Sequence, residues 1–519
     1  MERLRAAPGP WRGRAIVVAG LLLALVAVVA IATARRDDDA SYAATEEWRL
    51  PEARWPEARP EAELAALRAR VEAAFRPIVA PHGERIGVLV AGAAPGETLF
   101  AHEADRSFVP ASNVKLVTTA LVWLLIGPDE VYETRLLRTG PIEDGTLRGD
   151  LIVEGAGDPN LSPRAHGGAA ADPATELVVA LKAAGVVRVD GDLILDDGLF
   201  PRDGPPPGWT EETRTHWYAA EVSALVLNDA CVDIAARPGA KPGDPAIVTA
   251  VPEADGVEIV SEVTTVAKGT RSAIRFVRPV DGNRIVVAGR VEVGTAGESS
   301  PCAIHDPTRV FGGVTTRALR EAGISLGGTV RVEPGAAARA GGTAVATLRG
   351  TVGDAIVAAN VRSQNLCAEA LFRLLGARLE GEGSWEAGRR VAARALAEAG
   401  VDPESIRIVD GSGLSYDNAA TPRALADWLR FVGATAAGEA FRASLPAGGD
   451  GTLRGRLRGA GIAERTRLKT GTLTGRSALS GWVETDAGPL AISILSHRLR
   501  DRRAVEDRIV VALIRATSR

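Results

Sequence analysis

The spacing of apolar residues changes several times along this chain of 519 residues, and each change marks a different kind of element. Near residue 60 a period of three to four residues begins, which places Leu64, Leu67, Val71 and Phe75 on one face of an amphipathic helix. The same period predicts buried and amphipathic helices further on. They are expected around residues 115–125 and over residues 352–360, 366–379, 385–399, 422–431 and 502–514.

Short β-type runs separated by glycine, proline and Asp-Gly turns occupy the chain from about residue 137 to 344. Asp190-Gly191 and Asp281-Gly282 are hairpin signals in this region. A helix that ends at Gly323 closes it. The pattern therefore predicts a mostly β insertion. Its strands are expected over residues 150–154, 192–195, 224–235 and 284–293, and its helix over 308–322.

Alternating runs outside the insertion predict two strands before it and three after it. They lie at residues 86–90 and 98–102, and at 465–472, 476–484 and 489–496. With helices at both chain ends and a helical cluster between, the pattern predicts an α+β fold in which one sheet is split by the insertion. The expected domains are 61–136 and 345–519 for the two parts of the body and 137–344 for the insertion.

The N-terminal residues have the features of a targeting segment. Arginines precede an uncharged apolar run from Ala15 to Ala34, and charged residues follow it directly. A positive flank, an apolar stretch and a small-x-small exit are typical of a secretory signal, while a run near the ~20 residues that span a bilayer also fits an uncleaved anchor. Both predict an extracytoplasmic, periplasmic protein, secreted or held at the membrane by residues 1–36. Residues 37–60, with three Pro-Glu-Ala repeats, are predicted to be an extended proline-rich linker.

Charge and composition exclude several functions. A net charge of -4 gives no basic surface, so no nucleic-acid partner is expected. The six histidines lack the pairings of a zinc site or a Ser-His-Asp triad, and no metal or cofactor is predicted. The three cysteines cannot all pair within one chain, and a bridge between Cys231 and Cys302 is compatible with the sequence. The sequence is compatible with a monomer and with a homo-oligomer.

Lysine is rare here, with five lysines against 56 arginines. Two of the five lie in short motifs, Ser112-Asn113-Val114-Lys115 and Lys469-Thr470-Gly471. A desolvated amine can lose its proton and act as a base, whereas a guanidinium stays charged. Ser112, at the predicted start of a helix, has Lys115 one turn further along the same face. The pair is therefore a candidate nucleophile with its general base.

A second motif, Ser363-Gln364-Asn365, lies between the two lysines in the sequence. Ser363 can relay a proton between the nucleophile and a leaving amine, and the Asn365 amide can hold a peptide group of the substrate. Alone, this motif is more often a helix cap. The order of the motifs along the chain makes the combination specific.

The third motif ends an alternating run that predicts a strand. Lys469 offers a charge for a terminal carboxylate, and Thr470 offers a hydroxyl. The N–H of Thr472 is a candidate oxyanion donor beside that of Ser112. Gly471 is expected to let a ligand backbone approach the strand closely.

Ser-x-x-Lys, Ser-x-Asn and Lys-Thr-Gly in this order resemble the active-site set of the serine penicillin-recognising enzymes. With the long insertion and the segments at 155–161, 227–229 and 410–415, the chain from about residue 86 onward resembles class C low-molecular-mass penicillin-binding proteins, the D-alanyl-D-alanine carboxypeptidases and endopeptidases of peptidase family S13. This resemblance implies a serine β-lactamase/DD-peptidase-like domain with a five-stranded antiparallel sheet. It also implies an acyl-enzyme on Ser112, peptidoglycan stem peptides as substrates and β-lactam antibiotics as acylating inhibitors.

Two residues of the family pattern deserve separate mention. In relatives an acidic residue of the insertion meets the amine of the stem peptide's diamino acid, and Asp158 is the candidate here, with an Asp-Pro turn as the equal alternative. Many relatives have arginine directly after Gly-Ser-Gly-Leu-Ser, where this chain has Tyr416. Since tyrosine cannot grip a carboxylate with two parallel hydrogen bonds, amidated stem peptides are one hypothesis for its substrates.

Two other functions remain as alternatives at this stage. A β-lactamase needs a carboxylate that positions the deacylating water, and no Glu-x-x-x-Asn segment of the expected kind lies between the motifs. A non-catalytic, wall-binding scaffold has no chemical need for two rare lysines in intact motifs. The sequence does not separate carboxypeptidase from endopeptidase action, because both use the same residues.

Overall fold

The computed structural model describes residues 48–162 and 172–518. The apolar run at 15–34, with the predicted signal or anchor, and the first part of the predicted linker lie outside these residues. Within the two described ranges, no helix combines the length and the apolar character that a membrane crossing requires.

A five-stranded antiparallel sheet forms the body, with the strand order β2-β1-β22-β21-β20. Two of its strands precede the insertion and three follow it, so the predicted split sheet is confirmed. The long-range pairing runs from Ile86 opposite Ser496 to Ala91 opposite Ala491. The strands are β1 (Ile86–Ala91), β2 (Thr98–His102), β20 (Thr466–Leu473), β21 (Arg476–Thr485) and β22 (Gly488–His497).

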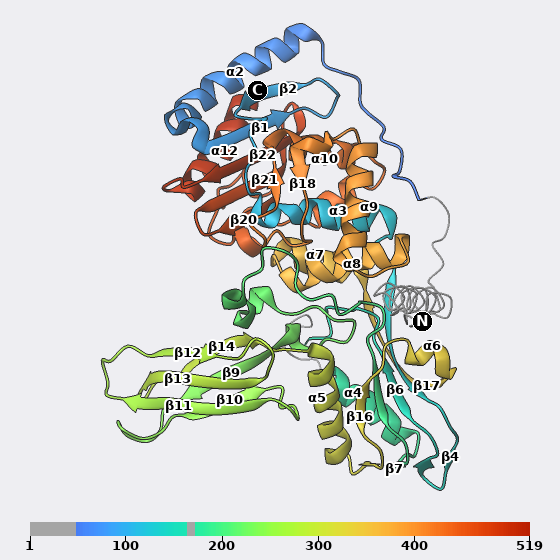
Figure 1. Cartoon of the computed structure of the whole chain (residues 1–519). Coiled ribbons are helices and arrows are strands. Elements are labelled where there is room, and N and C mark those ends of the chain that lie inside the picture. Colours follow the sequence, from blue (N-terminus) through green and yellow to red (C-terminus); the bar gives the residue numbers. More distant parts are fainter. Residues whose placement is uncertain (1–47, 163–171, 519) are drawn as a thin grey trace, which may run out of the picture. The chain divides into compact units, whose positions relative to one another are not determined.

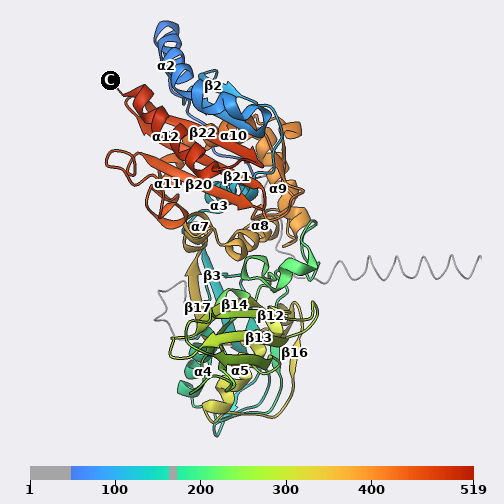
Figure 2. The ribbon, with the colours of Figure 1, turned by 90° about the vertical axis from the view of Figure 1, so that its left-hand side faces the viewer.

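Helices cover both faces of this sheet (Figures 1 and 2). The two terminal helices, α2 (Glu61–Val79) and α12 (Arg502–Thr517), share one apolar core with one face of the strands. The predicted stripe of α2, which includes Leu67 and Phe75, is buried in this core. Each such side chain contributes about 1.5–3 kcal/mol through its burial. Helix α10 (Pro422–Ala434) packs on the opposite face.

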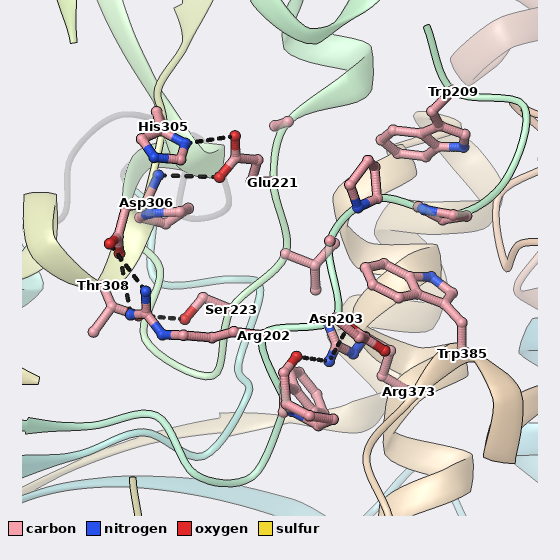
Figure 3. Close-up of a pocket in the computed structure, with 18 of the residues that line it drawn as sticks. Arg202, Asp203, Trp209, Glu221, Ser223, His305, Asp306, Thr308, Arg373 and Trp385 are labelled. Atoms are coloured by element: carbon pink, nitrogen blue, oxygen red, sulfur yellow. Dashed lines mark hydrogen bonds and ion pairs between the residues drawn. The ribbon is translucent and has the colours of Figure 1, made fainter. Parts of the chain in front are cut away.

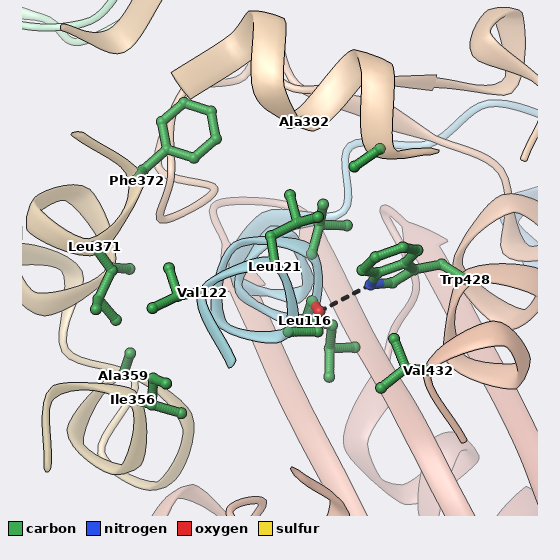
Figure 4. Close-up of a cluster of buried hydrophobic side chains, with 14 of the residues drawn as sticks. Leu116, Leu121, Val122, Ile356, Ala359, Leu371, Phe372, Ala392, Trp428 and Val432 are labelled. Atoms are coloured by element: carbon green, nitrogen blue, oxygen red, sulfur yellow. Dashed lines mark hydrogen bonds between the residues drawn. The ribbon is translucent and has the colours of Figure 1, made fainter. Parts of the chain in front are cut away.

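A second core surrounds helix α3 (Lys115–Leu125), which is seen end-on in Figure 4. Every residue of α3 from Lys115 to Val122 is buried, because the neighbouring helices and the strands of the body sheet surround it. The indole N–H of Trp428 donates to the carbonyl of Leu116 over 3.0 Å and joins α10 to α3. The other helices of the cluster are α7 (Val352–Val361), α8 (Asn365–Leu379), α9 (Trp385–Glu398) and α11 (Gly438–Ala443).

The insertion begins and ends with a pair of antiparallel strands, β3 (Val131–Arg138) and β17 (Thr343–Thr351). The predicted limits at 137 and 344 therefore cut through both strands, and the boundaries lie near residues 130 and 352. These strands belong to the sheet β16-β8-β6-β3-β17. Its other members are β6 (Leu151–Glu154), β8 (Leu193–Asp196) and β16 (Val330–Val332), and a small four-stranded sheet contains β4 (Ile142–Glu143), β5 (Thr146–Leu147), β7 (Arg188–Val189) and β15 (Ser325–Leu326).

Two three-stranded sheets complete the insertion. The predicted strand at 224–235 is only half correct, since Asn228, Asp229 and Ala230 have positive φ angles of 49°, 58° and 52° and break the run. Such angles end an extended strand, so pairing starts only at Cys231. The strands are β9 (Cys231–Arg237), β10 (Ile247–Val251) and β14 (Glu298–Ala303), and β11 (Glu258–Val266), β12 (Ala273–Val277) and β13 (Arg284–Glu292).

Helices also flank the sheets of the insertion. The predicted closing helix is present as α5 (Pro307–Glu321). The pattern analysis missed α4 (Pro173–Ala183), although Asp172 caps it by accepting the N–H of Ala174 over 2.9 Å. A five-residue helix, α6, covers Ala336–Ala340.

Residues 48–60, the described part of the predicted linker, form an extended strap that lies on the body. The N–H of Arg54 donates to the carbonyl of Ala434 over 2.8 Å. The N–H of Leu50 donates to Glu398 over 3.1 Å, and the Arg394 guanidinium lies 4.1 Å from the ring centre of Trp48. This part of the predicted linker is therefore extended and docked on the body.

All three cysteines are buried free thiols. In the pairing of β9 with β14, Cys302 lies opposite Val232 and Cys231 lies opposite Ala303. Because neighbouring residues of a strand point to opposite faces, the two thiols project from different faces of the sheet. The bridge that the sequence allowed is thus absent, and burial raises the pKa of Cys302 to about 11.

We predict that protein denatured without reductant releases three titratable thiols per chain, because no pair can form without breaking the register of β9 and β14. A thiol-reactive dye measures this number directly, with a fully reduced sample as the control. A value of one thiol per chain would contradict the register.

Candidate active site

The predicted nucleophile and base lie together at the start of α3. Ser112 lies in the 3₁₀ turn η2 (Ala111–Val114), which leads directly into the helix at Lys115. The Lys115 Nζ lies 3.2 Å from the Ser112 Oγ. The serine is half-buried and the lysine is fully buried. The Ser112 hydroxyl therefore lies on the side of the desolvated amine that faces the solvent.

Close backbone contacts fix the position of Ser112. Ala111 has a φ of 48°, a conformation that costs energy for a residue with a Cβ. A Cβ on Gly413 would lie 1.9 Å from the Ala111 carbonyl oxygen. A Cβ on Gly471 would lie 2.8 Å from the Pro110 carbonyl oxygen and 3.1 Å from the Ser112 nitrogen. Because they lack a Cβ, both glycines let neighbouring segments pack closely against the nucleophile turn. At Gly471 the segment that approaches is the protein's own backbone.

Asn113, one of the two variable residues of the first motif, joins the nucleophile turn to the third motif. Its side-chain amide donates to the Lys469 carbonyl over 2.8 Å, and its Oδ1 accepts from Ser480 over 3.0 Å. Asn113 is fully buried. No sequence pattern indicates this role, because an asparagine inside Ser-x-x-Lys looks like any other variable position.

Lys115 is held by three acceptors. Besides Ser112, its Nζ donates to Asn365 Oδ1 and to the Ser412 carbonyl, each over 2.7 Å. Burial lowers the pKa of Lys115 to about 8, while the carboxylates of Glu369 and Asp410 act in the opposite direction. Roughly a tenth of the amine is therefore neutral at pH 7 and able to accept a proton.

The second and third motifs meet through Ser363 and Lys469. The Lys469 Nζ donates to the Ser363 Oγ over 2.8 Å and to the Thr470 carbonyl over 2.9 Å. Burial, and then the charge of Lys115, hold the pKa of Lys469 well below its usual value. Ser363 has a φ of 59°, so the backbone is strained at the second serine as well.

The remaining residues of the third motif line the same edge. Thr470 donates from its hydroxyl to Thr452 over 2.8 Å. Thr472 is exposed on β20, opposite Ser477 of β21. Since a Cβ on Gly471 would lie 3.1 Å from the Ser112 nitrogen, the strand backbone that leads into Thr472 passes close to the nucleophile turn, where an oxyanion donor is needed.

A buried carboxylate on α8 organises the loop that contacts Lys115. Glu369 accepts the N–H groups of Gly411 and Ser412 over 2.9 and 2.7 Å, and the indole N–H of Trp385 over 2.7 Å. Burial, and then the charge of Asp410, raise the pKa of Glu369 to about 7. Sequence reasoning missed Glu369, because a glutamate in an apolar helix is recognised only when its partners are known.

Asp410 holds the same loop from the other side. Its carboxylate accepts the N–H groups of Gly413 and Ser415, each over 2.7 Å, and a side-chain N–H of Asn418 over 2.8 Å. The indole N–H of Trp209, from the insertion, completes this set over 2.9 Å. The segment 410–415 is therefore a rigid frame that offers the Ser412 carbonyl to Lys115.

Two alternatives were left open for Asp158, a contact with substrate and an Asp-Pro turn. Only 2% of its surface is exposed, and its Oδ1 accepts the N–H of Asn160 over 2.8 Å. A Cβ on Gly350 would lie 2.2 Å from its Oδ2. Asp158 therefore lies in a buried turn against β17, which favours the turn alternative over a contact with substrate.

The insertion reaches the active site through residues 212–218. The side-chain amide of Asn365 donates to the Tyr218 carbonyl over 2.7 Å. Burial raises the pKa of Tyr218, and the Glu212 carboxylate and the Tyr416 hydroxyl act in the same direction. Glu212 is exposed, and Tyr416 is 44% exposed with its hydroxyl 3.4 Å from the Thr474 carbonyl. These side chains lie around the mouth of the site.

A half-buried serine beside a desolvated lysine, with a second serine–lysine pair at a β-edge, defines a serine acyl-transfer site of the penicillin-recognising type. Residues 68–516 match the profile of the D-Ala-D-Ala carboxypeptidase 3 (S13) family. The chain belongs to this family.

Individual relatives agree with this assignment. The chain is 31% identical to a D-alanyl-D-alanine carboxypeptidase of Actinomadura sp. over 468 residues, which are 87% of this chain and 85% of the relative. It is 24% identical to D-alanyl-D-alanine carboxypeptidase DacB of Haemophilus influenzae over 79% of this chain and 84% of the relative. The crystal structure of penicillin-binding protein 4 from H. influenzae superimposes with a TM-score of 0.73 at 22% identity, covering 85% of this chain and 97% of the other.

Replacement of Glu369 by glutamine tests the frame around Lys115. The Glu369 charge raises the pKa of Lys115, so its loss should lower that pKa and move the acid limb of the acylation profile to lower pH. Imperfect bonding to Gly411 and Ser412 should also reduce the maximal rate by about 10- to 100-fold.

The rate of acylation by a penicillin across pH 5–10 measures both effects. Glu386→Gln, on an exposed residue of α9, is the matched control and should leave the profile unchanged. An acid limb that stays in place in the Glu369 variant would contradict the role given to Glu369.

Proposed function

We propose that this protein cleaves the terminal D-Ala-D-Ala bond of peptidoglycan stem peptides through an acyl-enzyme on Ser112. The observation that carries the proposal is the 3.2 Å contact between the Ser112 Oγ and a buried Lys115 amine. Burial favours the neutral amine, which is the form that can take a proton from the hydroxyl.

Each step of the reaction has a group in reach. Lys115 accepts the Ser112 proton while the Oγ attacks the carbonyl carbon of the penultimate D-alanine. The N–H groups of Ser112 and Thr472 stabilise the oxyanion, and collapse of this intermediate breaks the peptide bond. The proton held by Lys115 passes through the Ser363 hydroxyl to the leaving amine, which returns Lys115 to its neutral form. Water then attacks the ester with Lys115 as base, which releases the shortened stem peptide and restores the Ser112 hydroxyl.

Substrate contacts come from the second and third motifs. The Lys469 side chain, whose charged form a bound carboxylate would favour, and the hydroxyl of Thr470 hold the terminal carboxylate at the edge of β20. The Asn365 amide, already fixed between Lys115 and the Tyr218 carbonyl, offers a hydrogen bond to a substrate peptide group. Because these residues are buried or half-buried, they are in place before substrate arrives.

Glu212 is a better candidate than Asp158 for the acid that meets the amine of the stem peptide's diamino acid. Glu212 is exposed and close enough to Tyr218 to raise its pKa, whereas Asp158 is enclosed in a turn. Tyr218 lies within electrostatic reach of Glu212 and of Tyr416. An amine bound there gains a carboxylate and a ring face.

Both carboxypeptidase and endopeptidase action fit this site, because a D-amino acid cross-link presents the same bond. The β-lactamase alternative is weaker, because it needs a carboxylate that positions the deacylating water. Glu369 and Asp410 are the two buried carboxylates near Lys115, and each already accepts backbone N–H groups of the 410–415 frame. The acyl-penicillin should therefore be long-lived. A non-catalytic scaffold has no need of two buried lysines, whose burial is costly.

The expected location supports the same function. The apolar run at 15–34 is proposed to send the chain across the membrane, as a cleaved signal or as an anchor, to the compartment where peptidoglycan lies.

We predict that a fluorescent penicillin labels Ser112 and that the label persists for hours. Ser112→Ala should abolish labelling, and Lys115→Arg should slow it by about 100- to 10,000-fold, because a guanidinium cannot accept the proton. Gel fluorescence and mass spectrometry of the labelled peptide measure the rate and the position. Lys241→Arg, on an exposed lysine of the insertion, is the control and should label normally. Labelling of the Lys115 variant at the normal rate would contradict the mechanism.

A second prediction concerns the effect of Tyr416 on recognition of the side-chain carboxyl of the stem peptide. Tyr416→Arg should raise kcat/KM for free-acid stem peptides relative to amidated ones by about tenfold, because arginine can bind a carboxylate with two hydrogen bonds. Tyr416→Phe is the control and should keep the preference of the natural protein. A natural protein that clearly prefers the free acid would remove the amidation hypothesis without touching the role of Ser112.

A further inference from the structure

Arg373 is a buried arginine on α8, the helix that also carries Asn365 and Glu369, but no step of the proposed reaction involves it. Its side chain is 2% exposed and lies one turn after Glu369. Burial lowers the pKa of Arg373 to about 10, while the carboxylates of Asp203, Glu369 and Asp197 act in the opposite direction, so the guanidinium stays charged near neutral pH. A buried cation is costly unless its partners replace the lost water, and these partners therefore indicate what the residue does.

The insertion supplies one group of partners for this guanidinium. Arg373 pairs with Asp203 over 3.1 Å and donates to the Pro201 carbonyl, and its guanidinium lies 5.0 Å from the ring centre of Phe200. Figure 3 shows Asp203 beside Arg373. Because all three partners belong to one short segment, Arg373 fixes residues 200–203 of the insertion against α8.

The body supplies the other group of partners, at the start of α9. The Arg373 Nε donates to the Gly383 carbonyl over 2.7 Å, and the guanidinium covers the Trp385 ring at 4.2 Å from its centre (Figure 3). Gly383 lies two residues before Trp385, and a Cβ on Gly383 would clash with the Leu199 carbonyl oxygen. Arg373 therefore holds both the backbone before Trp385 and the face of its ring, where the insertion packs closely.

Trp385 carries this constraint to the active site. Its indole N–H donates to Glu369 over 2.7 Å, and the same carboxylate accepts the N–H groups of Gly411 and Ser412. The Ser412 carbonyl in turn accepts from the Lys115 Nζ over 2.7 Å. One continuous set of contacts therefore joins the insertion to the general base.

The plane of the Trp385 ring decides where its N–H points, because the indole has a single donor. With the Arg373 guanidinium over one face, the ring is held in the plane that directs this donor at Glu369. Without that contact, Glu369 would lose part of the set of donors that fixes its carboxylate. Outer contacts of this kind orient the groups that act directly, and their loss reduces activity by about 10- to 100-fold.

We infer that Arg373 is a positioning residue for the acyl transfer proposed above, on which this inference rests. Through the Trp385 indole it keeps the 410–415 frame in the place where that frame orients Lys115. Because Arg373 is itself held by residues 200–203, the insertion contributes to the geometry of the general base from a distance.

A double-mutant cycle on the full-length protein, with acylation of Ser112 by a penicillin as the reaction, tests this role. Arg373→Met should lower the maximal acylation rate by about 10- to 30-fold. The penicillin concentration that gives half of this rate should change by less than about twofold, because no contact of the guanidinium is with a motif residue. In the Glu369→Gln background the same replacement should cost less than about twofold, since the route through Glu369 is already broken.

Two further variants complete the design, and circular dichroism checks that each variant is folded. Arg390→Met, on an exposed arginine of α9, is the control and should keep the natural rate. Asp203→Ala loosens the same contact from the insertion, through a side chain that is 33% exposed, and should slow acylation by about threefold to tenfold. It takes the place of Arg373→Met in the cycle if that variant does not fold.

Three results would overturn the role of Arg373. They are an unchanged maximal rate in the folded variant, a loss confined to the half-maximal concentration, and a rate that falls by the same factor with Glu369 and with Gln at position 369. A natural protein that penicillin does not acylate would instead overturn the proposed function, and the inference with it.

Discussion

The buried ammonium of Lys115 is the constraint on which the rest of this structure depends. A fully buried amine is costly unless its surroundings either hydrogen-bond it or accept its proton, and this site does both. The Ser412 carbonyl and the Asn365 amide oxygen hold it, while burial lowers its pKa to about 8 and prepares it for proton transfer from Ser112. Helix α3 lies at the centre of the helical cluster because only a closed core can keep this lysine dry.

The remaining architecture keeps three distant parts of the chain at that lysine. The split sheet brings the Lys469 edge against the nucleophile turn, and Asn113 and Gly471 fix the contact. Helix α8 supplies Asn365 at its start and Glu369 one turn later, so one element both touches Lys115 and orders the 410–415 frame. The insertion then closes the site through the Tyr218 carbonyl and the Trp209 indole. Catalysis and folding share the same hydrogen bonds.

The sequence alone predicted the split sheet, the helices of the body and the grouping of Ser112, Lys115 and Lys469, because these depend on period and motif order. It failed where the outcome depends on partners distant in sequence. The two alternatives for Asp158, a contact with substrate or a turn, could not be separated without knowing its surroundings, and the docking of residues 48–60 depends on a contact with the distant Ala434. The strand predicted across residues 228–230 ends at three positive φ angles, which no apolar pattern reveals.

Because the chain contains few lysines, the titration of Lys115 is the most direct measurement. With five lysines in the chain, lysine labelled with ¹³C at Cε gives few enough signals to follow through a pH titration. The account predicts that the Lys115 signal, assigned by its loss in Lys115→Arg, titrates near 8, well below the value of about 10.4 for a lysine side chain in a model peptide. A Lys115 signal that titrates at the model-peptide value would contradict a base prepared by burial.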